Sequence, residues 1–207
     1  MATGISRRVA PGVVALTMAL AAAGCGGTSA RSSSSGRAAL ASASSSAGPA
    51  FGWLRAAAAP RGWTVARIPD GATMAYPARW RLIETDPGTA SAALYSSGDR
   101  MIGYLNLTPQ DGGETLRNWI HFRVSHNADE NDRTMQTIAS ATRLRFRSGP
   151  GSCVQDAYTT TSHARYIEIA CLVSGRRGGV VIVGAAPPDE WRTVAPALER
   201  AISAITA

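Results

Sequence analysis

Hydrophobic and polar residues alternate in short runs along the chain from Phe51 onward. Alternation with a period of two places successive side chains on opposite faces of an extended strand. Glycine, serine and proline separate the runs, as they do where turns join strands. The pattern predicts nine strands of an antiparallel sheet, over residues 63–68, 72–77, 79–84, 90–96, 101–108, 142–147, 153–160, 164–173 and 180–186.

Two other segments repeat their apolar residues at helical spacing. Asp111 is predicted to open the first helix, with Glu114 reaching back to it in a variant of the capping box. The apolar positions of this helix are Leu116, Trp119, Ile120 and Val124. One face of the helix is expected to meet the sheet, so the predicted fold class is α+β, an antiparallel sheet with helices packed on it.

The second predicted helix closes the chain. Asp189 and Glu190 precede it, where the helix dipole favours negative charge. Pro196 lacks the amide that would bond to Arg192, so we expect a kink at this position. The apolar stripe of the helix consists of Trp191, Val194, Leu198, Ile202 and Ile205.

Cys153 and Cys171 set the register of one predicted hairpin. A turn centred on Ser162 places them directly opposite each other, and opposed Cα atoms of an antiparallel pair lie close enough for a disulfide. Once Cys25 is assigned to lipid, as argued below, these two form an even pair, which suits an oxidising compartment. We therefore predict a Cys153–Cys171 disulfide.

The same register sets Asp156 opposite Glu168. Facing carboxylates can act as an acid and base pair or bind a cation, but like charges directly opposed destabilise a sheet unless something compensates them. We favour a solvated ion-pair network with the arginines that alternate on the preceding strand. Two alternatives remain, namely an extracellular hydrolase that uses the two acids and a polyanion-binding face. That basic face would be formed by Arg143, Arg145 and Arg147.

Other candidate chemistry is sparse. His121 and His126 are five residues apart and do not share the i, i+4 face of a helical metal pair, and His163 lies in the predicted hairpin turn. The chain has no nucleophile elbow, phosphate loop or dinucleotide glycine pattern. We expect no metal, no cofactor and no enzymatic activity. Trp53 and Trp63, near the start of the domain, are candidates for lining a binding groove or meeting a partner.

The N-terminus has the three parts of an export signal. Arg7 and Arg8 precede the apolar run Val13–Ala23, which is about half as long as a membrane-spanning helix requires. The tetrad Ala22-Ala23-Gly24-Cys25 resembles the bacterial lipobox. This resemblance implies cleavage before Cys25 and a diacylglycerol on its sulfur, whether export follows the Sec or the twin-arginine route.

A serine-rich stretch follows Cys25 and has too few apolar residues to offset the entropy of ordering it. We therefore predict three parts: a lipoprotein signal peptide at 1–24, a flexible tether at 25–50, and a single globular domain at 51–207.

Charge narrows the range of partners. The formal net charge of +7 falls to +5 when Arg7 and Arg8 leave with the signal, and all 21 basic residues are arginine. Together with abundant alanine and glycine, this bias is typical of a GC-rich genome. No basic run is interleaved with aromatic residues, so we expect no nucleic-acid partner.

The segment "IPDGATMAYPARWRLIE" is followed by paired strands, a helix, a further meander and a terminal helix. This order resembles the PsbP-like fold found in many actinobacterial lipoproteins. The segments "YLNLTPQ", "LRFRSGPGSCV" and "YIEIACLV" are similar to segments of uncharacterised actinobacterial lipoproteins. The resemblance implies a sheet sandwiched by helices and a non-enzymatic binding or assembly role. We therefore expect a lipoprotein anchored through Cys25 on the outer face of the membrane, binding an envelope protein or a small ligand.

Overall fold

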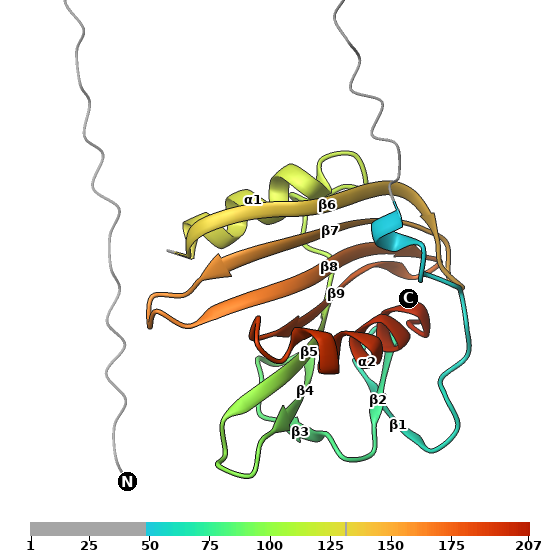
Figure 1. The fold of residues 1–207 in the computed structure, drawn as a ribbon. Coiled ribbons are helices and arrows are strands. Elements are labelled where there is room, and N and C mark those ends of the chain that lie inside the picture. Colours follow the sequence, from blue (N-terminus) through green and yellow to red (C-terminus); the bar gives the residue numbers. More distant parts are fainter. Residues whose placement is uncertain (1–48, 131) are drawn as a thin grey trace, which may run out of the picture. The chain divides into compact units, whose positions relative to one another are not determined.

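The computed structural model describes residues 49–130 and 132–207. The predicted signal peptide, and residues 25–48 of the predicted tether, lie outside the described residues. The described chain begins with a short 3₁₀ turn, η1 (Pro49–Phe51), and continues into two sheets and two α-helices (Figure 1).

All nine predicted strands are present. Two of them form a small hairpin sheet, and the other seven form one antiparallel sheet in the order β3-β4-β5-β9-β8-β7-β6. Their bounds are β1 (Trp63–Arg67), β2 (Thr73–Pro77), β3 (Arg81–Ile83), β4 (Ala90–Tyr95), β5 (Met101–Pro109), β6 (Arg133–Arg145), β7 (Pro150–Thr159), β8 (Arg165–Gly175) and β9 (Gly178–Ala186).

Strand β6 begins at Arg133, well before the predicted run at 142–147. Its pairing with β7 shifts register at three places, between Arg133 and Gln136, between Thr137 and Ala139, and between Ala141 and Leu144. A bulge moves the following side chain to the other face, so these shifts erase the alternation that would have marked the strand.

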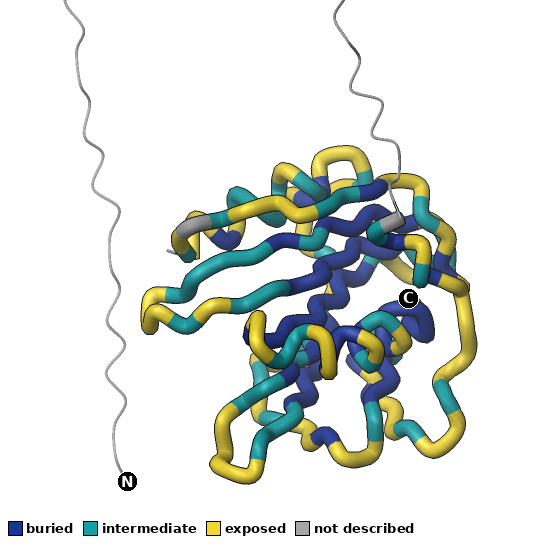
Figure 2. Tube along the Cα trace, viewed as in Figure 1, coloured by how far each residue is buried: buried dark blue, intermediate teal, exposed yellow. Residues whose placement is uncertain are grey.

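Helix α2 (Trp191–Ser203) packs on one face of the large sheet. Figure 2 shows buried positions concentrated in the central strands and interspersed with exposed ones along this helix. The predicted stripe is confirmed, since Trp191 is half-buried and the others are at most 1% exposed. The helix continues through Pro196, whose carbonyl accepts a hydrogen bond from Arg200 Nε at 2.9 Å. The kink stays a prediction.

No helix in the described ranges has the length and apolar character to cross a membrane.

Helix α1 (Trp119–Asp129) lies on the opposite face, against β6 and β7. The indole Nε1 of Trp119 donates to the carbonyl oxygen of Ala170 at 3.0 Å. This indole belongs to a second core cluster that also contains Val154, Ala170, Leu172, Val181 and Val183. Helices therefore cover both faces of the sheet, and the predicted α+β fold class is confirmed.

The predicted start of the first helix is wrong. The amide of Asp111 does donate to Glu114 Oε1 at 3.0 Å, but this bond closes a turn instead of opening a helix. A second turn follows, in which the amide of Thr115 donates to Asn118 Oδ1 at 2.6 Å. The glycines at 112 and 113 make helix formation costly here, so the helix begins only at Trp119.

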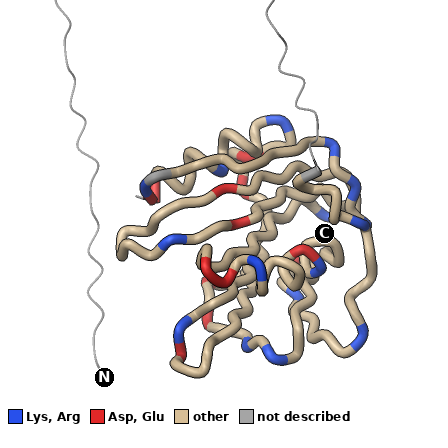
Figure 3. Tube along the Cα trace, in the orientation of Figure 1, with Lys and Arg blue, Asp and Glu red and all other residues tan. Residues whose placement is uncertain are grey.

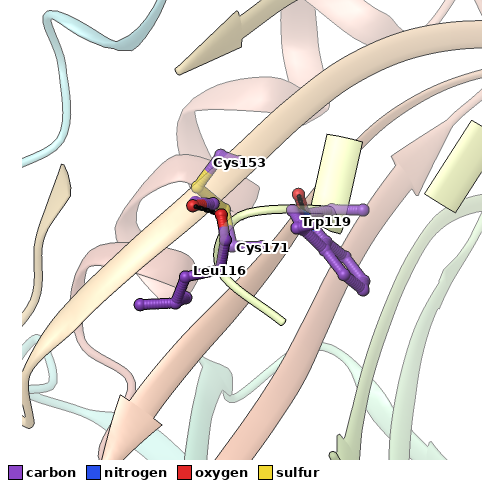
Figure 4. Close-up of a disulfide and its surroundings, with 6 residues drawn as sticks. Leu116, Trp119, Cys153 and Cys171 are labelled. Atoms are coloured by element: carbon purple, nitrogen blue, oxygen red, sulfur yellow. Dashed lines mark hydrogen bonds between the residues drawn. A yellow bond between two sulfur atoms is a disulfide. The ribbon is translucent and has the colours of Figure 1, made fainter. Parts of the chain in front are cut away.

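The β7–β8 hairpin has the predicted register, with Cys153 opposite Cys171 and Asp156 opposite Glu168. A disulfide joins the cysteines, whose Cα atoms lie 4.1 Å apart. Figure 4 shows this bond together with Leu116, which precedes α1, and Trp119, the first residue of α1. The cysteines belong to the core on the α2 face. Because faces alternate along a strand, the two acids point to the α1 face.

Candidate functional site

Asp156 on β7 and Glu168 on β8 stand side by side, and both residues are fully buried. Figure 3 shows that acidic positions occur in neighbouring strands of the large sheet. Two buried carboxylates in contact are costly, because each ionised group loses its water and repels the other. The surroundings must therefore neutralise at least one of them.

Arg123, on α1, neutralises Glu168. Its Nε donates to Glu168 Oε1 at 2.7 Å and its Nη2 donates to Oε2 at 2.9 Å, which is the bidentate geometry of a strong charge-assisted pair. Asn127 Nδ2 adds a donor to Oε1 at 3.3 Å. The predicted solvated ion-pair network is thus wrong, since the acids are buried and the arginine comes from the helix above the sheet.

Asp156 has no partner of this kind. Neither carboxylate oxygen has a hydrogen-bond donor among the described residues. Burial, reinforced by nearby Glu168 and opposed by Arg123, raises the pKa of Asp156 to about 8. Burial and Glu168 also raise the pKa of Tyr158. The single guanidinium of Arg123 is paired with Glu168, and a pKa of about 8 keeps Asp156 mostly protonated at neutral pH.

A groove of about 1280 Å³ opens on the same face of the sheet, and we call it the sheet–helix groove. Its lining comes from α1, from segment 84–89 after β3, and from the strands between them. On its floor Ser91 Oγ lies 3.2 Å from Tyr104 Oη and accepts a hydrogen bond from Asn106 Nδ2 at 2.8 Å. Glu168 lines the groove, whereas Asp156 does not.

The sheet–helix groove is acidic although the whole chain is basic. Arg123 lines it but is already paired with Glu168, and His126 lies 3.2 Å from Glu130. The carboxylates of the lining therefore outnumber its cations, which favours a positively charged occupant. These carboxylates are Glu84, Asp86, Asp111, Glu114, Glu130 and Glu168.

The arginines predicted to accompany the acids lie elsewhere. Arg143, Arg145 and Arg147 are exposed near the turn from β6 to β7. Arg143 and Arg145 line a different cleft of about 850 Å³, to which Arg117 also contributes. We call it the arginine cleft.

The tryptophans and histidines considered in the sequence analysis lie outside any metal cluster in the described residues, and the tryptophans pack against the core. Trp53 and Trp63 are half-buried and pack against the main core, and neither lines the two hollows described above. His126 stacks on Phe122 with ring centroids 6.1 Å apart, while His121 and His163 are exposed. Within residues 49–130 and 132–207 no three metal-ligating side chains gather into one group.

Sequence reasoning missed Arg123, Asn127 and Arg117. A signal for the first two exists, because Trp119, Arg123 and Asn127 recur at i, i+4 and so share one face of α1. A helix face that buries a tryptophan also buries the polar residues one and two turns on, and these require partners. Arg117 precedes the helix and carried no such signal.

Comparison with solved structures identifies the fold. Cyanobacterial PsbP (CyanoP) from Synechocystis sp. PCC 6803 matches at 16% identity with a TM-score of 0.50, covering 70% of this chain and 92% of that one. The chain has a PsbP-like fold.

Two further structures match at lower similarity. LpqN, involved in cell envelope biogenesis of Mycobacterium tuberculosis, shows 13% identity and a TM-score of 0.42 over 70% of this chain and 89% of its own. Protein PA94 from Pseudomonas aeruginosa shows 11% identity and a TM-score of 0.48, with coverage of 70% and 96%. No family model matches the chain, and no curated protein matches it in sequence.

Proposed function

We propose that the protein is a cell-envelope lipoprotein, anchored to the outer face of the membrane through Cys25, whose PsbP-like domain binds a partner without catalysing a reaction. The N-terminal pattern supports export and lipidation, because a short apolar run ends directly before a cysteine and a polar tract. The disulfide between β7 and β8 is in keeping with an oxidising compartment outside the cytoplasm.

The sheet–helix groove is the binding site in this proposal. The observation that carries it is an acidic, polar-lined hollow of about 1280 Å³ on a protein of net positive charge. Its floor is pre-organised by the Ser91, Tyr104 and Asn106 hydrogen bonds, and its rim carries exposed carboxylates. A small cationic ligand, or a basic segment of an envelope protein, is complementary to such a surface.

The geometry argues against hydrolysis by the two acids. A general acid or base must come within hydrogen-bond reach of the substrate. Asp156 is fully buried and does not line the groove, and both oxygens of Glu168 are held by Arg123. Glu168 therefore attaches α1 to the sheet through Arg123, and Asp156 stays buried beside it away from any substrate.

Site-specific photo-crosslinking in intact cells tests the binding site. A photoreactive phenylalanine replaces Thr108 on the groove floor in one strain, and the exposed Val65 on β1 in another. We expect the Thr108 strain to capture an envelope component that the Val65 strain does not. Equal capture by both strains, or capture by Val65 alone, would remove the groove from the proposal.

Lipidation is tested separately with an alkyne fatty acid fed to growing cells. The wild-type chain should take up the label, and Cys25→Ser should lose it. Label that persists in the serine variant, or a wild-type chain that stays unlabelled, contradicts the anchor but leaves the groove experiment interpretable.

A further inference from the structure

The arginine cleft is separate from the sheet–helix groove and is built differently. Its charged lining is entirely basic, with Arg117 from the segment before α1 and Arg143 and Arg145 from β6. None of the three forms a salt bridge with a residue in the described part of the chain. Unpaired guanidiniums that converge on one hollow attract an anion, and their planar donors suit a phosphate.

The rest of the lining is largely apolar. The apolar groups come from Leu116, Leu144, Phe146 and Pro150, and Phe146 is only 6% exposed. Ser152 also lines the cleft, but its hydroxyl already donates to the carbonyl of Leu116 at 2.7 Å. An occupant of this cleft therefore gains by presenting hydrocarbon beside its charge. A purely polar polyanion would leave the apolar wall unused.

The backbone at the cleft is unusual. Arg143 has a φ of 59°, although it is neither glycine nor asparagine, and it lies where β6 shifts register between Ala141 and Leu144. A bulge of this kind re-aims side chains, and a left-handed residue costs free energy that the surroundings must offset. Here the irregularity lies at the cleft and brings Arg143 and Arg145 into the same lining.

The chain enters the domain beside this strand. Turn η1, where the described residues begin, packs against β6, as Figure 1 shows. The predicted tether leaves residues 26–48 between Cys25 and η1, and a flexible chain of that length has a root-mean-square length of about 26 Å. A domain held on such a tether from Cys25 stays within reach of the membrane surface, with its attachment point next to the strand that carries Arg143 and Arg145.

We propose that the arginine cleft binds an anionic phospholipid of that membrane, with the phosphate on the arginines and the first acyl methylenes against the apolar wall. The tether argument depends on the proposed lipid anchor, whereas the chemistry of the cleft does not. The site would orient the tethered domain on the membrane and leave the sheet–helix groove free for its partner.

The test uses the mature chain from residue 25 with Cys25→Ser, so that no lipid is attached and the disulfide is intact. Dihexanoyl phosphatidylglycerol, below its micelle concentration, is titrated and followed by ¹H–¹⁵N NMR. We expect shifts confined to residues around Arg117, Leu144 and Arg145. Dihexanoyl phosphatidylcholine, which carries no net charge, should bind at least tenfold more weakly.

Two double variants distinguish binding at the arginine cleft from a general effect of the protein's positive charge. Arg143→Gln with Arg145→Gln should weaken binding by at least tenfold, since two charge-assisted contacts are lost. Arg61→Gln with Arg192→Gln removes the same charge from exposed positions outside the cleft and should change affinity less than threefold. Circular dichroism checks that both variants fold.

Two water-soluble phosphates, glycerol 3-phosphate and polyphosphate, show whether the cleft prefers a phospholipid or any phosphate. Glycerol 3-phosphate should bind far more weakly than the lipid, by about fourfold for each methylene that the wall covers. Glycerol 3-phosphate or polyphosphate binding as tightly as the lipid would overturn the proposal in favour of a simple anion site. Equal binding of phosphatidylcholine, or equal losses in the two paired variants, would overturn it as well.

Discussion

Replacing Asp156 by asparagine should change how stability depends on pH. The carboxyl is fully buried and lacks a hydrogen-bond donor among the described residues. The titratable groups around it are Glu168, Arg123, Asp132 and Tyr158. Burial and Glu168 raise the pKa of Asp156 from 3.8 to about 8, so the folded protein keeps a proton that the unfolded chain releases near pH 4.

The sign and size follow from proton linkage. Between pH 4 and pH 8 the folded state binds one more proton at this site than the unfolded state, so the free energy of unfolding falls as pH rises. The slope is about 1.4 kcal/mol per pH unit, which amounts to about 3 kcal/mol between pH 5 and pH 7. This is a sizeable part of the stability of an ordinary domain.

Urea unfolding of wild type and Asp156→Asn at pH 5, 6 and 7 measures this contribution. The asparagine resembles the protonated carboxyl in shape and charge but does not titrate. We expect the stability difference between the two proteins to shift by about 3 kcal/mol in favour of the variant from pH 5 to pH 7. Asp132, whose pKa burial also raises, affects both proteins, so the difference between them isolates Asp156.

A difference between the two proteins that is the same at all three pH values would refute the reasoning. It would mean that Asp156 has the same pKa in the folded and unfolded states, which requires a donor or water at its carboxylate. A shift in favour of the wild type from pH 5 to pH 7 would refute it more directly, because the charged carboxylate would then be stabilising.

Three further predictions concern the elements that hold the site together. Arg123→Met should lower the free energy of unfolding in urea by about 3–5 kcal/mol, because it leaves Glu168 buried and unpaired. Adding Glu168→Leu should recover most of this loss, and an Arg123→Met variant as stable as wild type would contradict the pairing. Replacing both Cys153 and Cys171 by alanine should lower the free energy of unfolding by about 3 kcal/mol and make the melting temperature insensitive to reductant. If reductant does not change the melting temperature of the wild type, that result contradicts the disulfide. Gly151→Ala should destabilise the protein by about 1–3 kcal/mol, since the added Cβ would lie 2.4 Å from Phe146 and 2.9 Å from the carbonyl oxygen of Leu172. In the control Gly112→Ala the added Cβ has no atom within 4 Å, so thermal unfolding should be nearly unchanged, and equal effects of the two substitutions would refute the packing argument.

Local patterns predicted much of the fold. The nine strands, the register of the β7–β8 hairpin and the stripe on α2 all follow from periodicity of two or of about 3.6 residues. Prediction failed at the long first part of β6, where bulges erase the alternation, and at the start of α1, where Asp111 and Glu114 form a turn instead. In β6 the irregular pairing with β7 overrides the local pattern, and before α1 the two glycines favour turns over helix.

Local sequence patterns predicted only part of the candidate site. Pairing along one hairpin placed Asp156 opposite Glu168, but it could not place Arg123 above them, because the position of a helix over a sheet depends on packing between distant segments. The arginine cleft also depends on packing between distant segments. Arg117 and Arg145 are far apart in sequence and share one lining only through the contact of two elements.

The sequence by itself determined the elements, their faces and one register, because these depend on residues that are close along the chain or joined by a symmetric hairpin. The tertiary structure decided which charges are buried, which are paired and which remain open to a ligand. These outcomes depend on the water that α1 excludes from the sheet face, and desolvation is a property of the packed molecule and not of any single segment.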